Sequence, residues 1–98
     1  MRRDDVLAIL AAHRDELHEQ FGVKSLALFG SVARDEAGPE SDVDLLVEFD
    51  RRPVGLFEFI DVKMALERLL GVPVDLATPG SLRERIRRSV ERDVIHVA

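Results

Sequence analysis

The segment from Gly30 to Val47 constrains the fold of this chain more than any other stretch. An apolar run, residues 26–29, ends at the pair Gly30-Ser31, and after ten further residues Asp42-Val43-Asp44 opens a second apolar run. The intervening residues include a Gly-Pro pair, which is typical of a loop. The order predicts a buried strand, a turn into a short helix, a polar loop and a second strand.

Two acids share one face of the second strand. Side chains alternate along a strand, so Asp42 and Asp44 point the same way, with Cα atoms about 6.5 Å apart, while Val43, Leu45 and Val47 point to the other face. Adjacent carboxylates repel each other unless a cation lies between them. Hard divalent ions such as Mg²⁺ prefer oxygen ligands, so the pair predicts a cation site.

The Gly30-Ser31 turn complements this cation site. Backbone N–H groups and a hydroxyl at the start of a helix bind anions. A phosphate site beside a Mg²⁺ site is what phosphoryl or nucleotidyl transfer requires. Each motif is weak alone, and the combination at this spacing carries the interpretation.

Asp75 is a third candidate. It lies between Val74 and Leu76, which should face the core, so its carboxylate should point to the opposite face of its strand. If the second and third strands are neighbours, Asp75 joins Asp42 and Asp44 on one surface. Three carboxylates on adjacent strands make a site for two metal ions credible.

Helices and strands alternate along the rest of the chain. Apolar residues at helical spacing predict one helix over 4–21, ended by Gly22, and another over 56–70, ended by Gly71. The first buries Val6, Ile9, Leu10, Leu17 and Phe21; the second presents Leu56, Phe59, Ile60, Met64 and Leu69/Leu70 to the core, with Met64 as core filler. The remaining expected elements are strands at 23–29, 42–49, 72–77 and 93–97, a helical turn at 31–36 and a helix at 81–91.

This order predicts an α/β (α+β) fold, with helices packed on a small sheet of three to four strands. About twelve residues join the first two strands, which is short for a parallel crossover. We therefore expect a mixed or antiparallel sheet. Pro73 suggests an edge or strand-entry position for the third strand. Ninety-eight residues fit a single domain, 1–98.

Composition excludes several classes of protein. The net charge of −5 argues against nucleic-acid binding driven by overall charge. There are no cysteines, hence no disulfides or thiolate metal sites. No apolar run reaches membrane-spanning length and no signal-peptide pattern opens the chain, so a cytoplasmic location is the default expectation.

Together these motifs resemble the nucleotidyltransferase superfamily that includes DNA polymerase beta, and within it the minimal nucleotidyltransferases (MNT) of bacteria and archaea. The matching segments are Leu28–Arg34, Ser41–Val47 and Val74–Leu76. The resemblance implies a polymerase-beta-type core spanning nearly the whole chain. It also implies that Gly30, Ser31 and Arg34 contact the nucleotide triphosphate, that Asp42, Asp44 and Asp75 hold two Mg²⁺ ions, and that ATP is the substrate.

One position departs from the family pattern. Many minimal members have Arg-Gly-Glu where this chain has Arg34-Asp35-Glu36. The extra charge of Asp35 either weakens triphosphate binding or points into solvent. Arg34 either contacts phosphate or a partner, or forms an ion pair with Glu36 or Glu40.

The resemblance also implies a partner. Minimal members are commonly paired with HEPN-domain toxins, and some attach AMP to a tyrosine of the toxin. A chain this short lacks an acceptor-binding domain, so we expect a hetero-oligomer in which the partner presents the acceptor. Two alternatives stay open: an antitoxin that acts by binding alone, and transfer to a small molecule, which the short chain disfavours. The last helix carries Arg83, Arg85, Arg87, Arg88 and Arg92, either as a docking face for an acidic partner or as a solvated surface.

Overall fold

The computed structural model describes the chain except residues 1, 37, 39–41, 51–53, 82–83 and 98, and gives no side chains at 81–86 and 89. The four strands form one sheet in the order β3-β2-β1-β4. The elements are α1 (Arg3–Ala12), α2 (Arg14–Phe21), β1 (Val23–Phe29), α3 (Gly30–Ala33), β2 (Val43–Phe49), α4 (Leu56–Leu70), β3 (Val74–Ala77), the 3₁₀ turn η1 (Pro79–Ser81), α5 (Glu84–Asp93) and β4 (Ile95–His96).

The sheet is mixed, as expected. β1 pairs antiparallel with β2 and with β4, whereas β2 pairs parallel with β3. The link between β1 and β2 is too short for a parallel crossover, but α4 alone supplies 15 residues for the connection from β2 to β3. β3 is an edge strand, which accommodates Pro73 directly before it.

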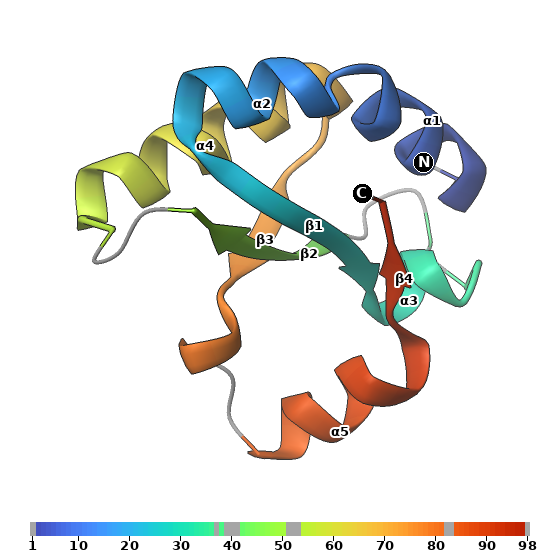
Figure 1. Cartoon of the computed structure of the whole chain (residues 1–98). Helices are drawn as coiled ribbons and strands as arrows, with labels where there is room; N and C mark the ends of the chain where they lie inside the picture. Colours follow the sequence, from blue (N-terminus) through green and yellow to red (C-terminus); the bar gives the residue numbers. More distant parts are fainter. Residues whose placement is uncertain (1, 37, 39–41, 51–53, 82–83, 98) are drawn as a thin grey trace.

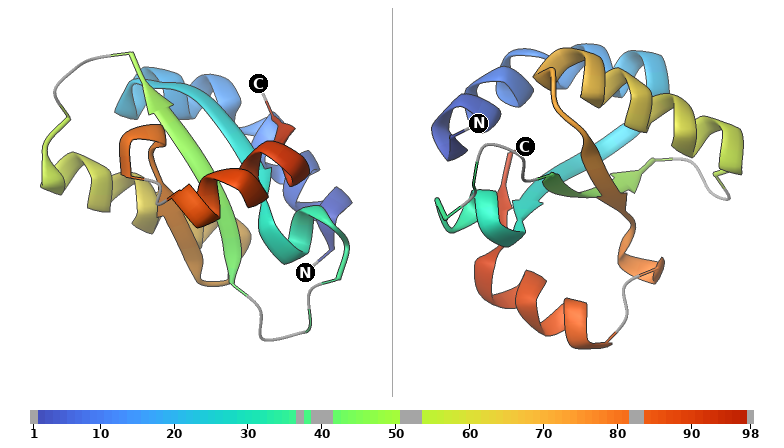
Figure 2. Two further views of the ribbon diagram at one scale, coloured as in Figure 1. Left: turned by 90° about the horizontal axis from the view of Figure 1, so that it is seen from below. Right: turned by 180° about the vertical axis from the view of Figure 1, so that it is seen from behind.

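Helices cover the two faces of the sheet unequally. α1, α2 and α4 lie together on one face, and α5 crosses the other (Figures 1 and 2). Burial along β2 follows this division, because Val43, Leu45 and Val47 are fully buried while Asp44, Leu46 and Glu48 are half-buried. The main core therefore lies between the sheet and the three helices, and the predicted acids lie on the α5 side.

The single helix predicted over 4–21 is wrong in one respect: it is broken at His13. In a continuous helix the His13 N–H would bond to the carbonyl of Ile9, but here it bonds to Leu10, and the His13 ring donates to the Ile9 carbonyl through Nδ1 at 2.9 Å. The side chain thus replaces the missing helical bond. The predicted apolar stripe survives the break, since Val6, Leu10 and Leu17 are buried.

The predicted apolar face of α4 is wrong in part, although its limits, 56–70, are confirmed. Leu70 is buried, and Phe59 and Leu69 pack against the core as predicted. The buried residues are Val62, Ala65, Leu66 and Leu70. Leu56 is 70% exposed, Phe57 81%, Ile60 39% and Met64 50%, so Met64 is not core filler. α4 carries apolar residues on two opposite sides, and the side centred on Val62 and Leu66 is the one that meets the sheet.

The other predicted elements shift only at their ends. The second strand begins at Val43 rather than Asp42, and the third at Val74 rather than Val72. The Val74 N–H donates to the Glu67 carboxylate at 2.9 Å, which ties the start of β3 to α4. Among the residues described, no helix is long and apolar enough to cross a membrane.

Candidate active site

Strand register brings the predicted acids together. Asp44 is paired with Asp75 in the parallel β2–β3 ladder and with Phe29 in the antiparallel β1–β2 ladder. Gly30 follows Phe29 directly, so the end of β1, the start of β2 and the middle of β3 meet at one place. The condition set by the sequence, that the second and third strands be neighbours, is met.

Burial places these acids at one surface. Val74 and Leu76 are buried, while Asp75 between them is exposed, and Asp44 is half-buried beside it. Asp42 is exposed and precedes β2, so it belongs to the loop rather than to the strand. The three residues therefore present two carboxylates at the surface and one at the base of the site.

The electrostatics of Asp44 reflect this crowding. Partial burial raises its pKa to about 6, with further contributions from the negative charges of Asp75 and Asp42 and from a hydrogen bond with Asp75. The positive charge of Arg34 acts in the opposite direction. A carboxylate whose pKa is raised by neighbouring carboxylates is placed to share a proton or a cation with them.

Gly30 is required for two independent reasons. Its φ of +76° lies in the left-handed region, which L side chains rarely adopt. A Cβ at this position would also collide with the Asp44 carboxylate oxygen Oδ2. The turn after β1 can therefore bring its backbone against the acid of β2 only if residue 30 is glycine.

α3 continues from this turn as one helical turn of four residues, 30–33. Its first N–H groups lack helical partners, because the first four N–H groups of any helix do. Ser31 is half-buried next to them. So short a helix has little dipole, and any anion affinity here must come from the N–H groups and the hydroxyl themselves.

Arg34 is held by two carboxylates. Its Nη1 donates to Asp93 at 2.7 Å and its Nε to Glu36 at 3.0 Å. The ion pair with Glu36 is one of the alternatives that the sequence left open; Glu40 lies outside the described residues. Sequence reasoning missed Asp93, because the two residues are 59 positions apart and no motif links them.

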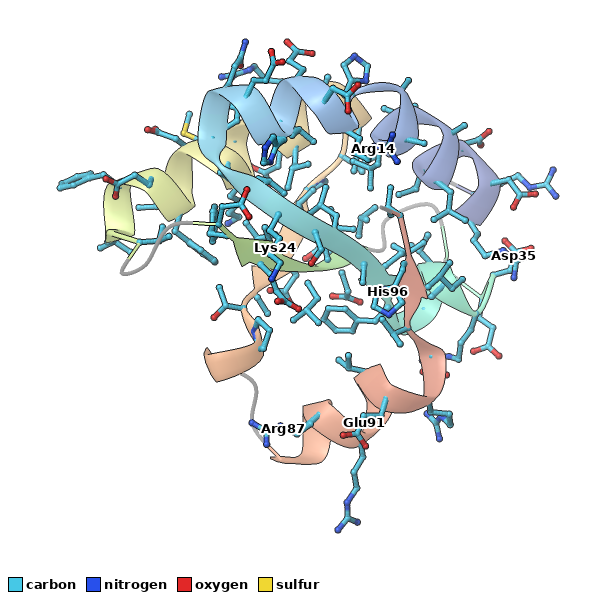
Figure 3. All side chains as sticks on the ribbon, in the orientation of Figure 1. Arg14, Lys24, Asp35, Arg87, Glu91 and His96 are labelled. Atoms are coloured by element: carbon cyan, nitrogen blue, oxygen red, sulfur yellow. The ribbon has the colours of Figure 1, made fainter. Side chains whose placement is uncertain are left out.

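Asp35 occupies the position where many family members have glycine. Its φ is +60°, which explains why glycine suits this position, and aspartate is among the few other residues that tolerate it. The side chain is exposed and lies at the periphery of the molecule (Figure 3). The alternative in which Asp35 points into solvent therefore agrees with the structure.

The donor set suits Mg²⁺, since Asp42, Asp44 and Asp75 offer only carboxylate oxygens and together carry excess negative charge. Among the described residues, however, no group of three or more metal-binding side chains is already arranged around one point.

The basic helix face is only partly described. Arg87, Arg88 and Arg92 are exposed on α5, and Arg92 Nε lies 3.3 Å from Asp93 (Figure 3 labels Arg87). The side chains of Arg83 and Arg85 lie outside the described set. A docking role for this face stays a prediction.

Comparison with known proteins agrees with this geometry. Residues 10–97 match the family described as nucleotidyltransferase domain. The protein adenylyltransferase MntA of Thermococcus cleftensis is 45% identical over 94 residues, which cover 96% of this chain and 94% of that protein.

Solved structures share the fold. One described as a candidate minimal nucleotidyltransferase has a TM-score of 0.77 and 38% identity, covering 97% of this chain and 95% of its own. An MNT antitoxin in complex with a tri-AMPylated HEPN toxin of Shewanella oneidensis has a TM-score of 0.66 over 94% of this chain and 71% of its own. At 16% identity the latter similarity concerns the fold alone.

Proposed function

The chain belongs to the nucleotidyltransferase domain family, and from this premise we propose that it is a Mg²⁺-dependent protein adenylyltransferase that acts as the antitoxin of a HEPN-domain toxin. The observation that carries the proposal is the register pairing of Asp44 with Asp75 directly beside Gly30. This pairing supports a cation site of carboxylates beside a turn that can bind phosphate. The 45% identity to a protein adenylyltransferase, MntA, supports AMP as the transferred group.

Gly30 and Ser31 are proposed to bind the triphosphate of ATP. The absence of a side chain at Gly30 lets its backbone lie directly against the Asp44 carboxylate. The Ser31 hydroxyl and the first N–H groups of α3 can donate to phosphate oxygens. Arg34 adds positive charge to the same region, because its field acts on Asp44.

The three carboxylates are proposed to hold two Mg²⁺ ions. When bound, these ions neutralise charge on the attacking and the leaving oxygen of the transferred phosphoryl group. Asp44 is the most deeply placed of the three acids, since it is half-buried and neighbours both of the others. Without a cation its charge is unfavourable, so cation binding and the ionised form of Asp44 favour each other.

Asp75 is proposed to face the acceptor. It is exposed on the edge strand β3, so the hydroxyl group of a second protein can approach it. Asp75 then either accepts the hydroxyl proton or orients the hydroxyl group. The oxygen attacks the α-phosphorus of ATP, a new P–O bond forms, and pyrophosphate leaves.

The acceptor is proposed to be a hydroxyl group of the toxin, and the family resemblance favours the hydroxyl group of a tyrosine. An antitoxin of similar fold occurs in complex with a tri-AMPylated HEPN toxin, which supports a protein acceptor.

The test uses ATP labelled at the α-phosphate, Mg²⁺ and a lysate of the native host. We compare the wild type, an Asp42→Asn/Asp44→Asn double variant, and Glu48→Gln as a matched control. Glu48 lies on the same strand and the same face as Asp44 but outside the cluster. A labelled protein is expected with the wild type and Glu48→Gln only.

Equal labelling by the double variant would refute the assignment of these carboxylates. No labelling by any variant, together with a stable complex in a pull-down, would favour an antitoxin that acts by binding alone. Label that appears only in a small molecule would instead favour transfer to a small-molecule acceptor.

A further inference from the structure

An ion pair joins the short helix of the active site to the end of the chain. Arg34 follows α3 and Asp93 ends α5, and the two elements lie side by side (Figures 1 and 2). We infer that Asp93 is a positioning residue, which holds Arg34 and thereby keeps the Gly30-Ser31 turn in place for the nucleotide triphosphate. This inference rests on the proposed function.

α3 needs such support because it consists of a single turn. The backbone N–H groups of Arg34, Asp35 and Glu36 bond to the carbonyls of Gly30, Val32 and Ser31 at 3.2, 3.0 and 2.9 Å, which closes this turn. All three bonds are local, and an isolated helical turn is unfavourable because so few bonds only partly offset the entropy of ordering it. A contact that fixes Arg34 therefore also stabilises the turn that starts at Gly30.

The position of Asp93 is not explained by the stability of its own helix. It is the last residue of α5, where a negative charge opposes the helix dipole. Its side chain is only 8% exposed, so its charge is also partly removed from water. Contacts with Arg34 Nη1 at 2.7 Å and with Arg92 Nε at 3.3 Å help to offset these costs.

The contact with Arg34 is shorter than that with Arg92. The hydrogen bond from Arg34 is also the largest contribution to lowering the pKa of Asp93 below its usual range. Arg92 lies next to Asp93 in sequence and is exposed. The contact with Arg34 therefore connects Asp93 to a different element. The pair joins the end of α5 to the residue that directly follows α3.

Glu36 provides a matched comparison. It binds the same guanidinium, at 3.0 Å from Nε, but it is 66% exposed and only two residues from Arg34. An exposed local pair contributes little and ties Arg34 to nothing beyond its own loop. Loss of Glu36 should therefore leave α3 in place, whereas loss of Asp93 should release it.

The sheet holds two of the three acids independently of α5, since Asp44 and Asp75 are fixed by the β2–β3 ladder. Release of α3 should thus weaken nucleotide binding more than it slows the chemical step. For Asp93→Asn we expect KM for ATP to rise about tenfold, the effect of losing one charge-assisted hydrogen bond, with kcat within about twofold. Glu36→Gln should change KM by less than about twofold.

The experiment measures KM and kcat for the wild type, Asp93→Asn, Asp93→Glu and Glu36→Gln, with circular dichroism to show that each variant is folded. Asp93→Glu keeps the charge and should restore most of the loss. A fall in kcat with unchanged KM would overturn the inference. A lower KM would overturn it too, because Asp93 would then compete with the triphosphate for Arg34.

Amide hydrogen exchange gives a readout that does not depend on activity. In Asp93→Asn, exchange at residues 31–34 should accelerate while Leu28 in β1 and Leu45 in β2 stay protected. Unchanged exchange at 31–34 would refute the positioning role even in a protein that transfers AMP. Accelerated exchange in a protein that labels nothing would refute the proposed function and leave the positioning role standing.

Discussion

Replacing Asp44 by asparagine should stabilise the metal-free protein. The pKa of Asp44 is raised from 3.8 to about 6 by partial burial and by the charges of Asp75 and Asp42. Asparagine has nearly the same shape and no charge, so it removes the repulsion and keeps the packing. The ionised carboxylate that is proposed to be essential for transfer thus lowers the free energy of unfolding of the metal-free protein.

The magnitude follows from the pKa shift. Each pKa unit corresponds to about 1.4 kcal/mol, so the shift sets an upper bound of roughly 3 kcal/mol at a pH well above 6. Asp44 is half-buried, and solvent screening reduces this to about 1 kcal/mol. For a domain of this size that free energy corresponds to a rise in Tm of about 4–8 °C.

The sign of the pH dependence is fixed by the direction of the shift. A pKa that is higher in the folded state than in the unfolded state adds stability at low pH, and this contribution is lost as the pH rises through about 6. Asp44→Asn should therefore match the wild type near pH 4 and exceed it at pH 8. Thermal melts in EDTA at both pH values measure this difference.

Glu48→Gln is the control, because it removes a carboxylate from the same face of β2 outside the cluster. It should shift Tm far less than Asp44→Asn does. Added Mg²⁺ should raise the Tm of the wild type and not that of Asp44→Asn. The reasoning would be refuted if Asp44→Asn raised Tm over the wild type by the same amount at pH 4 and pH 8, or if it had the lower Tm at pH 8.

Three further substitutions test the local structure by thermal or urea unfolding. Gly30→Ala should destabilise the fold by about 1–3 kcal/mol, because φ is +76° and the new Cβ meets Asp44; a neutral effect would contradict the described turn. Asp35→Gly should stabilise it by about 0.5–1 kcal/mol by relieving a φ of +60°, and a loss would indicate an unseen role for the carboxylate. Leu66→Ala should cost about 2–5 kcal/mol, as Leu66 is fully buried; a cost under 1 would place it outside the core.

Much of the site was predictable because strand alternation is a strong local rule. Val43 and Leu45 flank Asp44, and Val74 and Leu76 flank Asp75, so the side taken by each acid follows from its neighbours. The same rule misplaced Asp42, since a pattern of alternating residues does not show where a strand begins. Whether Asp44 and Asp75 meet depended on the sheet order, which α4 decides by acting as a crossover.

The errors have physical causes of two kinds. α4 carries apolar residues on two sides, and only packing selects the side of Leu66 over that of Met64. The break at His13 and the pair of Arg34 with Asp93 depend on single hydrogen bonds, which no periodicity records. Local patterns thus predict which face a side chain takes, while contacts between distant elements need the folded chain.

The apolar residues on the exposed side of α4 contribute little to the stability of the fold. Phe57 and Leu56 already lie mostly in water in the native state, so their removal takes almost nothing from the core. Their effect is on solubility: apolar groups in water favour association between molecules at high concentration. Polar residues can therefore replace Leu56 and Phe57 with little loss of folding free energy. The same change at the buried residues Val62 and Leu66, on the opposite side of the helix, would remove core packing.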